Sequence, residues 1–417
     1  MGRVTALFFG SVSAFLGILS LWASVPARGR RWLAQLQIVA DEMPLIGLVT
    51  GIAALWKGPR TGCRSAVLLG GIGSWAALRP WIRRAVVDQA LARAMREGLG
   101  LGWQRSIPPD VHRRFAQHRR TELVPQIARL LTRRVWITRD VLFAAPGGHP
   151  LRLDVIQPVG RRAADDAPAE APRPAIIVLH GGTWFQGDKS VYGFGVQNRW
   201  FATHGYVVFD VQYRINAQWP APLSDVKCAI RWVKSNAARF NVDPDRVALL
   251  GRSAGGHLAL LAAYTANDPA YPAACLGERD GHPPLDERVC AVITSGAPTD
   301  LRLWAPDPDG AIVHLLGGLP RDVPDAYDKS APVTHVNPGL PPTLVIHGQR
   351  DRTVPPDHAD LLVNRLRAAG VLSVALRVPG GRHGIDGLPF GLTGAMIQYD
   401  MDRFLAWAFF RKTEELV

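Results

Sequence analysis

The chain has 417 residues, of which 47% are hydrophobic, and its formal net charge is +13. This length suits one large α/β domain with an accessory region, and the hydrophobic content is typical of globular proteins. The excess of basic residues favours an anionic partner, either a nucleic acid or a membrane surface. Because the sequence contains no nucleic-acid-binding motif, we exclude that partner and expect the basic residues to face a membrane.

The cysteines do not decide the compartment of the protein. Four cysteines are too few for a disulfide scaffold. If the domain lies outside the cytoplasm, Cys275 and Cys290 are the expected pair, and in a reducing compartment both are free thiols.

Residues 1–90 contain three apolar segments and predict a helical membrane anchor. Residues 4–25 carry no charge, and at about 1.5 Å per residue a helix of this length crosses the roughly 30 Å bilayer core. A cleaved signal peptide is the alternative for this segment. Segments 43–56 and 65–78 are shorter than the usual span of about 20 residues. They predict a membrane hairpin or two short spans, with two buried helices of a soluble domain as the alternative.

Basic residues flank every apolar segment. If all three segments span, more arginines and lysines lie on the side of the C-terminal part, so the positive-inside rule favours a cytoplasmic C-terminal domain over one on the secreted or envelope side. Residues 91–134 form an Arg-rich connector. Beside an anchor, such a segment can lie on anionic headgroups, and a solvated helical face is the alternative.

Residues 135–417 alternate between strands and helices. Alternating or apolar residues at 135–144 and 151–156 predict an antiparallel hairpin. Continuous apolar runs predict buried strands at 175–179, 206–211, 246–250, 289–294, 343–346 and 373–378. Helical spacing occurs at 223–240, 258–266, 357–369 and 394–410, whereas segments 161–174, 267–288 and 300–337 are irregular. This order predicts an α/β fold with a mostly parallel central sheet flanked by helices.

The stretch Gly251-Arg252-Ser253-Ala254-Gly255 ends the strand at 246–250 and precedes the helical pattern. A sharp strand-to-helix turn requires small flanking residues, which the glycines supply, and it directs a serine hydroxyl off the end of the strand. Ser253 is therefore the candidate nucleophile.

Two further polar residues follow later strands. Asp351 comes after the strand at 343–346, and His383 comes after the strand at 373–378. A serine needs a base to take its proton, and the base needs an acid to orient it. We expect His383 to be the base and Asp351 the acid, with Asp300 as the rival acid.

An oxyanion site is predicted at His180-Gly181-Gly182-Thr183-Trp184, which follows the strand at 175–179. Acyl transfer places negative charge on the carbonyl oxygen, and preorganised backbone N–H groups stabilise that charge. The expected donors are the N–H groups of Gly182, Thr183 and Ala254, with Gly181 shaping the turn. His180, like His257 and His347, is expected to be structural, and Trp184 to pack.

From about residue 135 to the C-terminus the chain resembles the α/β-hydrolase superfamily. It is similar to carboxylesterases of the hormone-sensitive-lipase and feruloyl-esterase-like groups, and to the isoprenylcysteine methylesterase and kynurenine formamidase branch. The motifs that carry this resemblance are His180–Trp184, Gly251–Gly256, His347–Asp351 and Gly381–Gly384. The order Ser253, Asp351, His383 is that of α/β-hydrolases. Thr183 departs from the three glycines of lipase-type members.

The resemblance implies an α/β-hydrolase fold and serine-dependent hydrolysis of a carboxylic ester without metal or cofactor. We expect a membrane-anchored carboxylesterase or lipase that acts on a small-molecule or lipid ester, with segments 267–288 and 300–337 forming a cap. An amide or peptide hydrolase with the same triad, and a non-catalytic membrane scaffold, are the alternatives. The sequence does not predict the oligomeric state.

Overall fold

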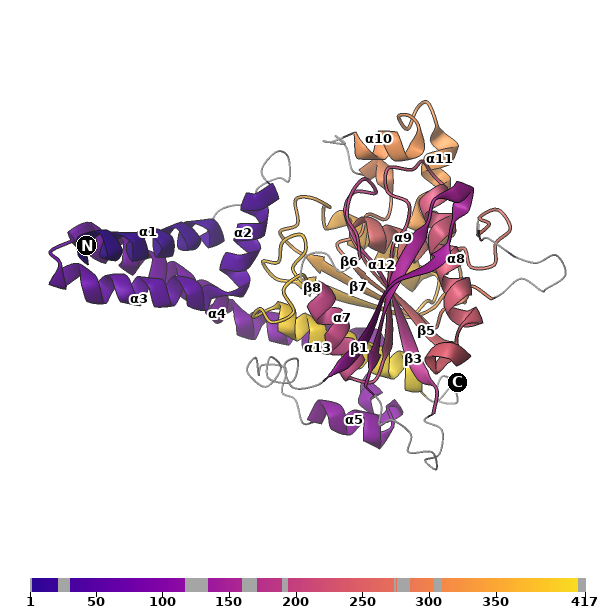
Figure 1. The fold of residues 1–417 in the computed structure, drawn as a ribbon, viewed down its shortest axis with the longest axis horizontal. Coiled ribbons are helices and arrows are strands. Elements are labelled where there is room, and N and C mark those ends of the chain that lie inside the picture. Colours follow the sequence, from indigo (N-terminus) through magenta and orange to yellow (C-terminus); the bar gives the residue numbers. More distant parts are fainter. Residues whose placement is uncertain are drawn as a thin grey trace.

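The computed structural model of the protein describes residues 2–21, 31–116, 134–159, 171–189, 194–273, 275, 286–303 and 310–411. It has two parts, a bundle of long helices and a larger α/β domain. The bundle projects from one side of the α/β domain (Figure 1).

The α/β domain is built on one eight-stranded sheet with the order β1-β2-β4-β3-β5-β6-β7-β8. β1 pairs antiparallel with β2, β2 pairs antiparallel with β4, and all other neighbours are parallel. The strand bounds are β1 Val135–Ala144, β2 Leu151–Pro158, β3 Arg173–Leu179, β4 Val207–Val211, β5 Val242–Arg252, β6 Ala291–Ser295, β7 Thr343–Gly348 and β8 Ser373–Val378. The predicted hairpin and mostly parallel sheet are therefore confirmed.

Helices cover both faces of the sheet. Along β3, Ile177 and Leu179 contribute to one apolar cluster and Ile176 and Val178 to the other, because successive strand residues face opposite sides. The first cluster includes residues of α8 (Ala221–Ser235), α9 (Ala254–Tyr264) and α12 (Asp357–Ala368). The second includes residues of α7 (Phe194–Thr203), α13 (Gly394–Phe410) and the end of α4 (Arg64–Leu99). Such a sheet is hydrophobic on both faces, which explains its continuous apolar strands.

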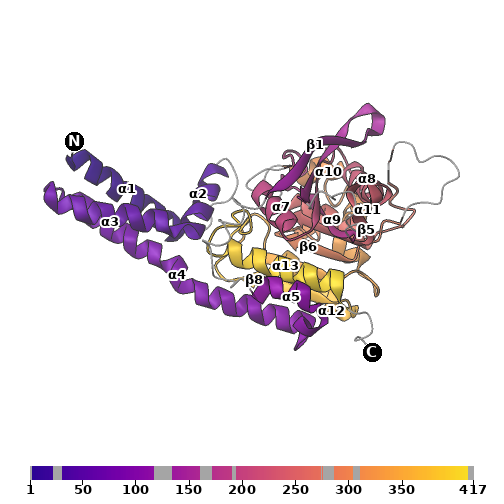
Figure 2. The same ribbon diagram turned by 60° about the horizontal axis from the view of Figure 1, so that its bottom comes forward.

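Three helices form the bundle: α1 (Gly2–Leu21), α3 (Pro44–Arg60) and the first half of α4. A shorter helix, α2 (Arg31–Glu42), lies where the bundle meets the α/β domain, and the axis turns by 80° between α2 and α3. The boundary expected at residue 90 falls inside α4. That helix continues from the bundle along the α/β domain beside α13 and β8, and Leu91 and Met95 on it are fully buried (Figure 2).

Several elements differ from the sequence expectations. β5 begins at Val242 rather than at residue 246, and α9 begins directly after Ser253 rather than at residue 258. α7 was not predicted. The segment at 300–337, expected to be irregular, contains α10 (Ala311–Leu316) and α11 (Pro324–Lys329), which lie together at the top of the α/β domain in Figure 1.

The remaining helical elements are short. The Arg-rich connector begins with the last residues of α4 and contains η1 (Trp103–Ser106) and α5 (Pro109–Ala116), and residues 117–133 of it lie outside the described residues. The other 3-10 turns are η2 (Pro146–Gly148), η4 (Ala238–Phe240), η5 (Leu301–Leu303) and η6 (Pro332–His335).

The expected pairing of Cys275 with Cys290 is wrong. Cys275 is bonded to Cys228 on α8, with 5.3 Å between the Cα atoms, and Cys290 is a free thiol. The segment after α9 runs back over α8, which brings Cys275 to Cys228, whereas Cys290 leads into β6. Burial raises the pKa of the Cys290 thiol to about 12, so little of it is thiolate near pH 7.

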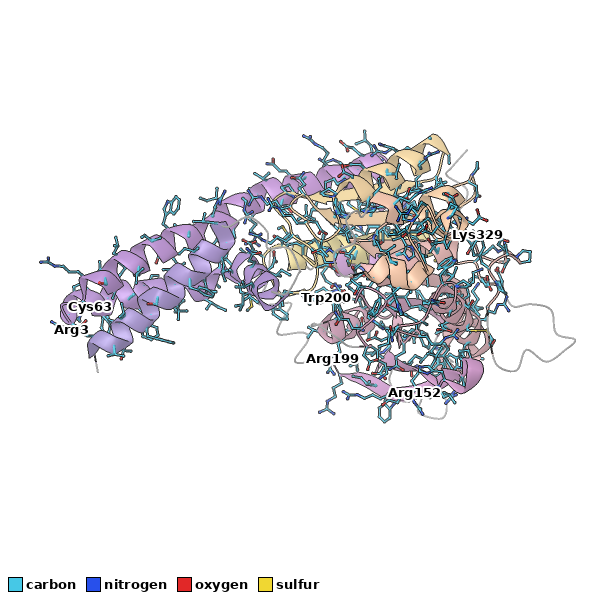
Figure 3. The ribbon with its side chains drawn as sticks, turned by 90° about the horizontal axis from the view of Figure 1, so that it is seen from above. Arg3, Cys63, Arg152, Arg199, Trp200 and Lys329 are labelled. Carbon is cyan, nitrogen blue, oxygen red and sulfur yellow. A yellow bond between two sulfur atoms is a disulfide. The ribbon has the colours of Figure 1, made fainter. Side chains whose placement is uncertain are left out.

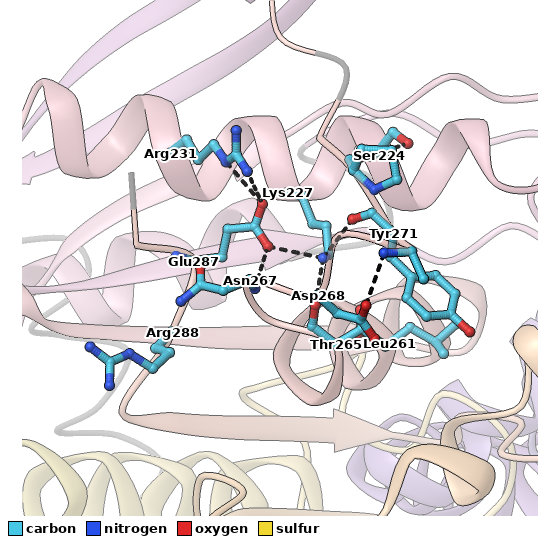
Figure 4. Close-up of polar contacts among 12 residues, drawn as sticks. Ser224, Lys227, Arg231, Leu261, Thr265, Asn267, Asp268, Tyr271, Glu287 and Arg288 are labelled. Carbon is cyan, nitrogen blue, oxygen red and sulfur yellow. Dashed lines mark hydrogen bonds and ion pairs between the residues drawn. The ribbon is translucent and has the colours of Figure 1, made fainter. Parts of the chain in front are cut away.

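A buried charge network also holds this segment to α8 (Figure 4). The Nζ atom of Lys227 lies 2.9 Å from the Glu287 carboxylate and donates to the carbonyl oxygens of Thr265 and Tyr271. Glu287 also accepts from Arg231 of α8 and from the backbone N–H of Asn267. The network fixes both ends of the 267–288 insertion, whose middle, residues 276–285, lies outside the described residues.

Candidate active site

Ser253 occupies a strained turn between β5 and α9. Its φ and ψ angles are 51° and −122°, a conformation that a non-glycine residue rarely adopts. The neighbouring glycine is required for space, since a Cβ on Gly255 would collide with the backbone carbonyls of Leu179 and His180. The sequence therefore folds locally into a turn that presents the serine at the carboxyl end of β5, where ligands bind in parallel sheets.

The structure brings Ser253, His383 and Asp351 together from three different strand ends. The Nε2 atom of His383 lies 3.2 Å from Ser253 Oγ, and its Nδ1 atom lies 2.7 Å from Asp351 Oδ2. An ionised carboxylate only accepts hydrogen bonds, so Nδ1 carries the proton and Nε2 is left as the acceptor for the serine hydroxyl. The arrangement has the geometry that a nucleophile and its general base require.

Asp351 is held firmly. Its side chain is buried, and Oδ1 accepts the backbone N–H groups of Thr353 and Val354, both at 2.9 Å. The rival acid, Asp300, is bonded instead to Arg302 at 2.9 Å, so the structure does not bring it to His383. His347 lies beside Asp351 but is bonded to the Val354 carbonyl, in agreement with a structural role.

The surroundings of His383 favour its protonated form. Burial lowers the pKa of the imidazole, but the Asp351 carboxylate, the hydrogen bond to it and the charge of Asp386 raise it above the ordinary value. The same interactions stabilise the imidazolium that forms when His383 takes a proton from serine.

The predicted oxyanion loop lies directly against the serine. A Cβ on Gly181 would lie 3.2 Å from Ser253 Cβ. Gly182 has φ 133° and Thr183 has φ 55°, so the loop turns sharply here. Within the part of the chain that the structure describes, no acceptor is hydrogen-bonded to the backbone N–H of Gly182, Thr183 or Ala254. These three donors are available for an oxyanion.

The other aromatic and imidazole side chains near the loop support it. His180 stacks on Tyr213 with 4.4 Å between ring centroids, and Tyr213 donates to the His180 carbonyl at 2.9 Å. His257 is buried, bonded to the Ser330 carbonyl and packed edge-on against buried Trp184. Burial lowers the pKa of His257 to about 4, so it stays neutral near pH 7. Both histidines and Trp184 are buried, and the packing of Trp184 agrees with the expectation for that residue.

Comparisons with known proteins agree with this fold. The BD-FAE family model matches residues 165–366, a range that contains Ser253 and Asp351 and ends before His383. Esterase LipC of Mycobacterium tuberculosis is 34% identical over 285 residues, which cover 66% of this chain and 66% of LipC. Esterase LipQ of the same organism is 29% identical over 349 residues, which cover 81% of this chain and 76% of LipQ.

Solved esterases share the α/β domain. A truncated carbohydrate esterase from gut microbiota superposes with a TM-score of 0.54 at 27% identity, over 66% of this chain and 96% of its own. The propionate-bound esterase Est2 of Thermogutta terrifontis gives a TM-score of 0.52 at 25% identity, over 68% of this chain and 97% of its own. The chain has the α/β-hydrolase fold and is similar to carboxylesterases with that fold. The alignment spans just under two thirds of LipC, so the activity of the whole protein is a matter for the proposal below.

An ion pair between Arg252 and Asp386, which the sequence did not predict, connects two segments of the site. Arg252, the residue before the nucleophile, is buried and donates to Asp386 at 2.6 Å, and Ser295 donates to the other oxygen of Asp386, also at 2.6 Å. The guanidinium also lies over the Phe194 ring at 3.9 Å. The pair links the serine turn to the loop of His383. The sequence gives one hint of this ion pair. Arg252 stands beside the nucleophile, where the side chain must be buried, and a buried arginine needs a charged partner.

Among the described residues, no group of three or more histidine, cysteine, aspartate or glutamate side chains could hold a metal ion. The site residues themselves are a hydroxyl, an imidazole, a carboxylate and backbone N–H groups. This set is sufficient for acyl transfer.

Proposed function

We propose that this protein is a serine carboxylesterase in which Ser253 is the nucleophile, His383 the general base and Asp351 the residue that orients His383. The observation that carries the proposal is the continuous set of contacts from Asp351 through His383 to Ser253, at 2.7 and 3.2 Å. The esterase names of LipC and LipQ and the esterase structures agree with it.

The reaction follows from this geometry. Ser253 Oγ attacks the acyl carbon while His383 Nε2 takes the hydroxyl proton, and the carbonyl oxygen becomes an oxyanion between the N–H groups of Gly182, Thr183 and Ala254. The oxyanion collapses, the bond to the alcohol oxygen breaks, and His383 returns the proton to the alcohol. Water then gives a proton to His383 and attacks the acyl carbon, the bond from that carbon to Ser253 Oγ breaks, and His383 returns the proton to Oγ as the acid leaves.

We also propose that the bundle is embedded in a membrane. Its buried residues are mostly small, and include Ala6, Gly10, Ser13, Ala14, Gly17, Gly47, Gly51, Ala54, Ala66, Gly70, Gly73, Ala76 and Ala77. Its exposed large apolar side chains include Val4, Leu7, Phe8, Phe15, Ile18, Leu45, Ile46, Val49, Ile52, Leu55, Trp56, Leu68, Ile72, Trp75 and Leu78. Small residues inside and large apolar residues outside are typical of helices packed in lipid.

The helix lengths agree with this proposal. α1 has 20 residues and is long and apolar enough to cross a membrane, whereas α3 is long enough only together with the end of α2 across the bend. At about 1.5 Å per residue α1 is roughly 30 Å long, the thickness of the hydrocarbon core. A catalytic domain fixed at the bilayer surface favours lipophilic esters, which partition into the membrane.

We infer that the catalytic domain faces an oxidising compartment, opposite to the side favoured by its flanking basic residues. The Cys228–Cys275 disulfide supports this, because disulfides persist outside the reducing cytoplasm. Arg83, one of the flanking basic residues, is paired with Asp41, which weakens the support that the positive-inside rule gives to a cytoplasmic domain.

Free Cys63 lies with Arg3 at the far end of the bundle (Figure 3). A membrane-impermeant maleimide should leave Cys63 unlabelled in intact cells and label it after lysis, and labelling in intact cells would contradict this orientation.

The esterase proposal is tested by hydrolysis of p-nitrophenyl esters from acetate to palmitate, with wild type beside Ser253→Ala. We expect turnover by wild type, a preference for longer chains, and a loss of roughly 10⁶-fold in kcat in the variant, the size seen when a nucleophilic serine is removed. Full activity of Ser253→Ala would overturn the proposal. Labelling of Ser253 by a fluorophosphonate without ester turnover would indicate an amide substrate.

A further inference from the structure

A buried polar junction joins helix α2 to the loop of the proposed base. Arg382, the residue before His383, is 4% exposed. Its Nε atom donates to Asp41 at 2.9 Å and its Nη1 atom to Gln37 at 3.3 Å, both on α2, while Nη2 donates to the Ser20 carbonyl of α1 at 3.4 Å. These three contacts of one guanidinium are therefore made to the N-terminal helices.

Asp41 is the centre of this junction. Besides Arg382, its carboxylate accepts the Ser20 hydroxyl at 2.6 Å and a guanidinium N–H of Arg83 at 3.3 Å. One carboxylate thus ties together α1, α2, α4 and the loop after β8. We call Ser20, Gln37, Asp41, Arg83 and Arg382 the Asp41 junction.

A second contact fixes the other end of the same loop. Glu42, next to Asp41, accepts the backbone N–H groups of Thr393 and Gly394 through one carboxylate oxygen, both at 2.8 Å. Its own carbonyl accepts the N–H of Leu392 at 3.0 Å. These bonds satisfy free N–H groups at the start of α13. The loop from β8 to α13, which carries His383, is therefore held against α2 at both ends.

His383 lies between two buried ion pairs. Inside the α/β domain, Asp386 on its C-terminal side pairs with Arg252 at 2.6 Å. On its N-terminal side, Arg382 pairs with Asp41 at 2.9 Å. A buried charge that loses its partner is strongly unfavourable, so each pair restricts where the loop can lie. The first pair belongs to the catalytic domain alone, whereas the second depends on the N-terminal helices.

We propose that Asp41 and Arg382 are positioning residues for His383, so that the N-terminal helices set the geometry of the catalytic triad as well as anchoring the protein. The inference rests on the proposed function, because it assumes that His383 is the base. Arg382 shares a peptide bond with His383, so a shift of the backbone at Arg382 moves the base relative to Ser253. A displacement of about 1 Å at a reacting group can cost about 10²-fold in rate.

The test uses the full-length protein in detergent with Arg382→Met, Asp41→Asn and Arg382→Lys. Reactive serine is counted with a fluorophosphonate, and kcat and KM are measured on one p-nitrophenyl ester. For the first two variants we expect kcat per reactive serine to fall by about 10²-fold with KM nearly unchanged, because substrate contacts are intact. Arg382→Lys keeps the charge but not the forked contacts of the guanidinium. Its kcat per reactive serine should lie between that of these variants and that of wild type.

A matched control removes a buried ion pair far from the loop. Arg231→Met breaks the contact with Glu287 and should lower the melting temperature without changing kcat per reactive serine. The double variant Asp41→Asn/Arg382→Met should have a kcat no lower than that of the slower single variant, since each substitution already breaks the same Asp41–Arg382 contact.

The pH profile separates positioning from simple loss of stability. The groups that face His383 are Asp351, Asp386, His347 and the Ser253 hydroxyl. Asp351 raises the pKa of His383, so a base that moves away from Asp351 has a lower pKa. His383 must be neutral to act as base, and the acid limb of kcat/KM should therefore move to lower pH in Arg382→Met and stay in place in Arg231→Met.

The outcomes are distinct. If Arg382→Met and Asp41→Asn keep wild-type kcat per reactive serine and the wild-type acid limb, and only melt earlier like Arg231→Met, the junction is structural and this inference is wrong. If Ser253→Ala, assayed beside them, retains activity, the proposed function is at fault instead.

Discussion

The two parts of the molecule bury opposite kinds of side chain. In the α/β domain, the strands bury large apolar residues such as Leu249, Ile293 and Ile346, which are completely inaccessible. In α1, α3 and α4 up to Pro80, all of which the structure describes, Leu19 is the one large aliphatic side chain among the buried residues. The comparison shows that the same apolar residue types form the core of one part and the outer surface of the other.

Helix α4 shows both patterns in one element. Along its first half, Gly70 and Gly73 are buried while Leu68 and Trp75 are 65% and 67% exposed. Along its last half, Leu91 and Met95 are buried against the α/β domain. The hydrophobic pattern therefore reverses within a single helix, as expected for a segment that leaves a membrane and joins a water-soluble domain.

The largest expected effect concerns a charge on the outer face of the bundle. Ile52 on α3 and Leu142 on β1 are similarly exposed, at 54% and 51%. Near the middle of a membrane helix, Ile52→Lys should cost about 2.5–3.5 kcal/mol of insertion free energy. We expect Ile52→Lys to shift part of the protein out of the carbonate-resistant membrane fraction, and Leu142→Lys to remain there like wild type.

Membrane retention of these two variants decides whether the outer surface of the bundle lies in lipid. If Ile52→Lys is as well retained in the membrane as Leu142→Lys, the outer face of α3 does not lie in lipid. The bundle would then be a soluble accessory domain, and its exposed apolar side chains would have to be covered by another protein surface.

Much of the fold and site follows from local sequence. The buried strands were predicted because parallel strands are continuous apolar runs, and Ser253, Asp351 and His383 were identified because each follows such a strand. Their proximity follows from topology, since the carboxyl ends of parallel strands share one edge of the sheet.

The contacts between distant segments could not be predicted. The Asp41–Arg382 pair joins residues 341 positions apart, and although Arg382 lies in the motif around His383, nothing in the sequence points to Asp41 as its partner. The Cys228–Cys275 bond was missed because one sequence does not show which segment crosses over α8. A domain boundary was expected at residue 90 because the composition changes there, but the backbone of α4 continues as a helix from Arg64 to Leu99. In each case the decisive information is which surfaces pack together.

A smaller effect is expected inside the bundle, where two glycines two residues apart on α4 form a matched pair. A Cβ on Gly73 would collide with the backbone and hydroxyl of Ser13 on α1, whereas a Cβ on Gly71 would meet no atom within 4 Å. Gly73→Ala should therefore destabilise the bundle by about 1–3 kcal/mol. Gly71→Ala should stabilise it by up to about 1 kcal/mol, because alanine favours helix more than glycine does.

Thermal unfolding of the two variants in detergent, followed by tryptophan fluorescence, measures this difference. The melting temperature should fall for Gly73→Ala and stay level or rise for Gly71→Ala. Equal shifts would mean that α1 and α4 do not approach closely at Ser13. Opposite shifts would support a bundle held together by close backbone contact, in contrast to the large interlocking side chains of the α/β domain.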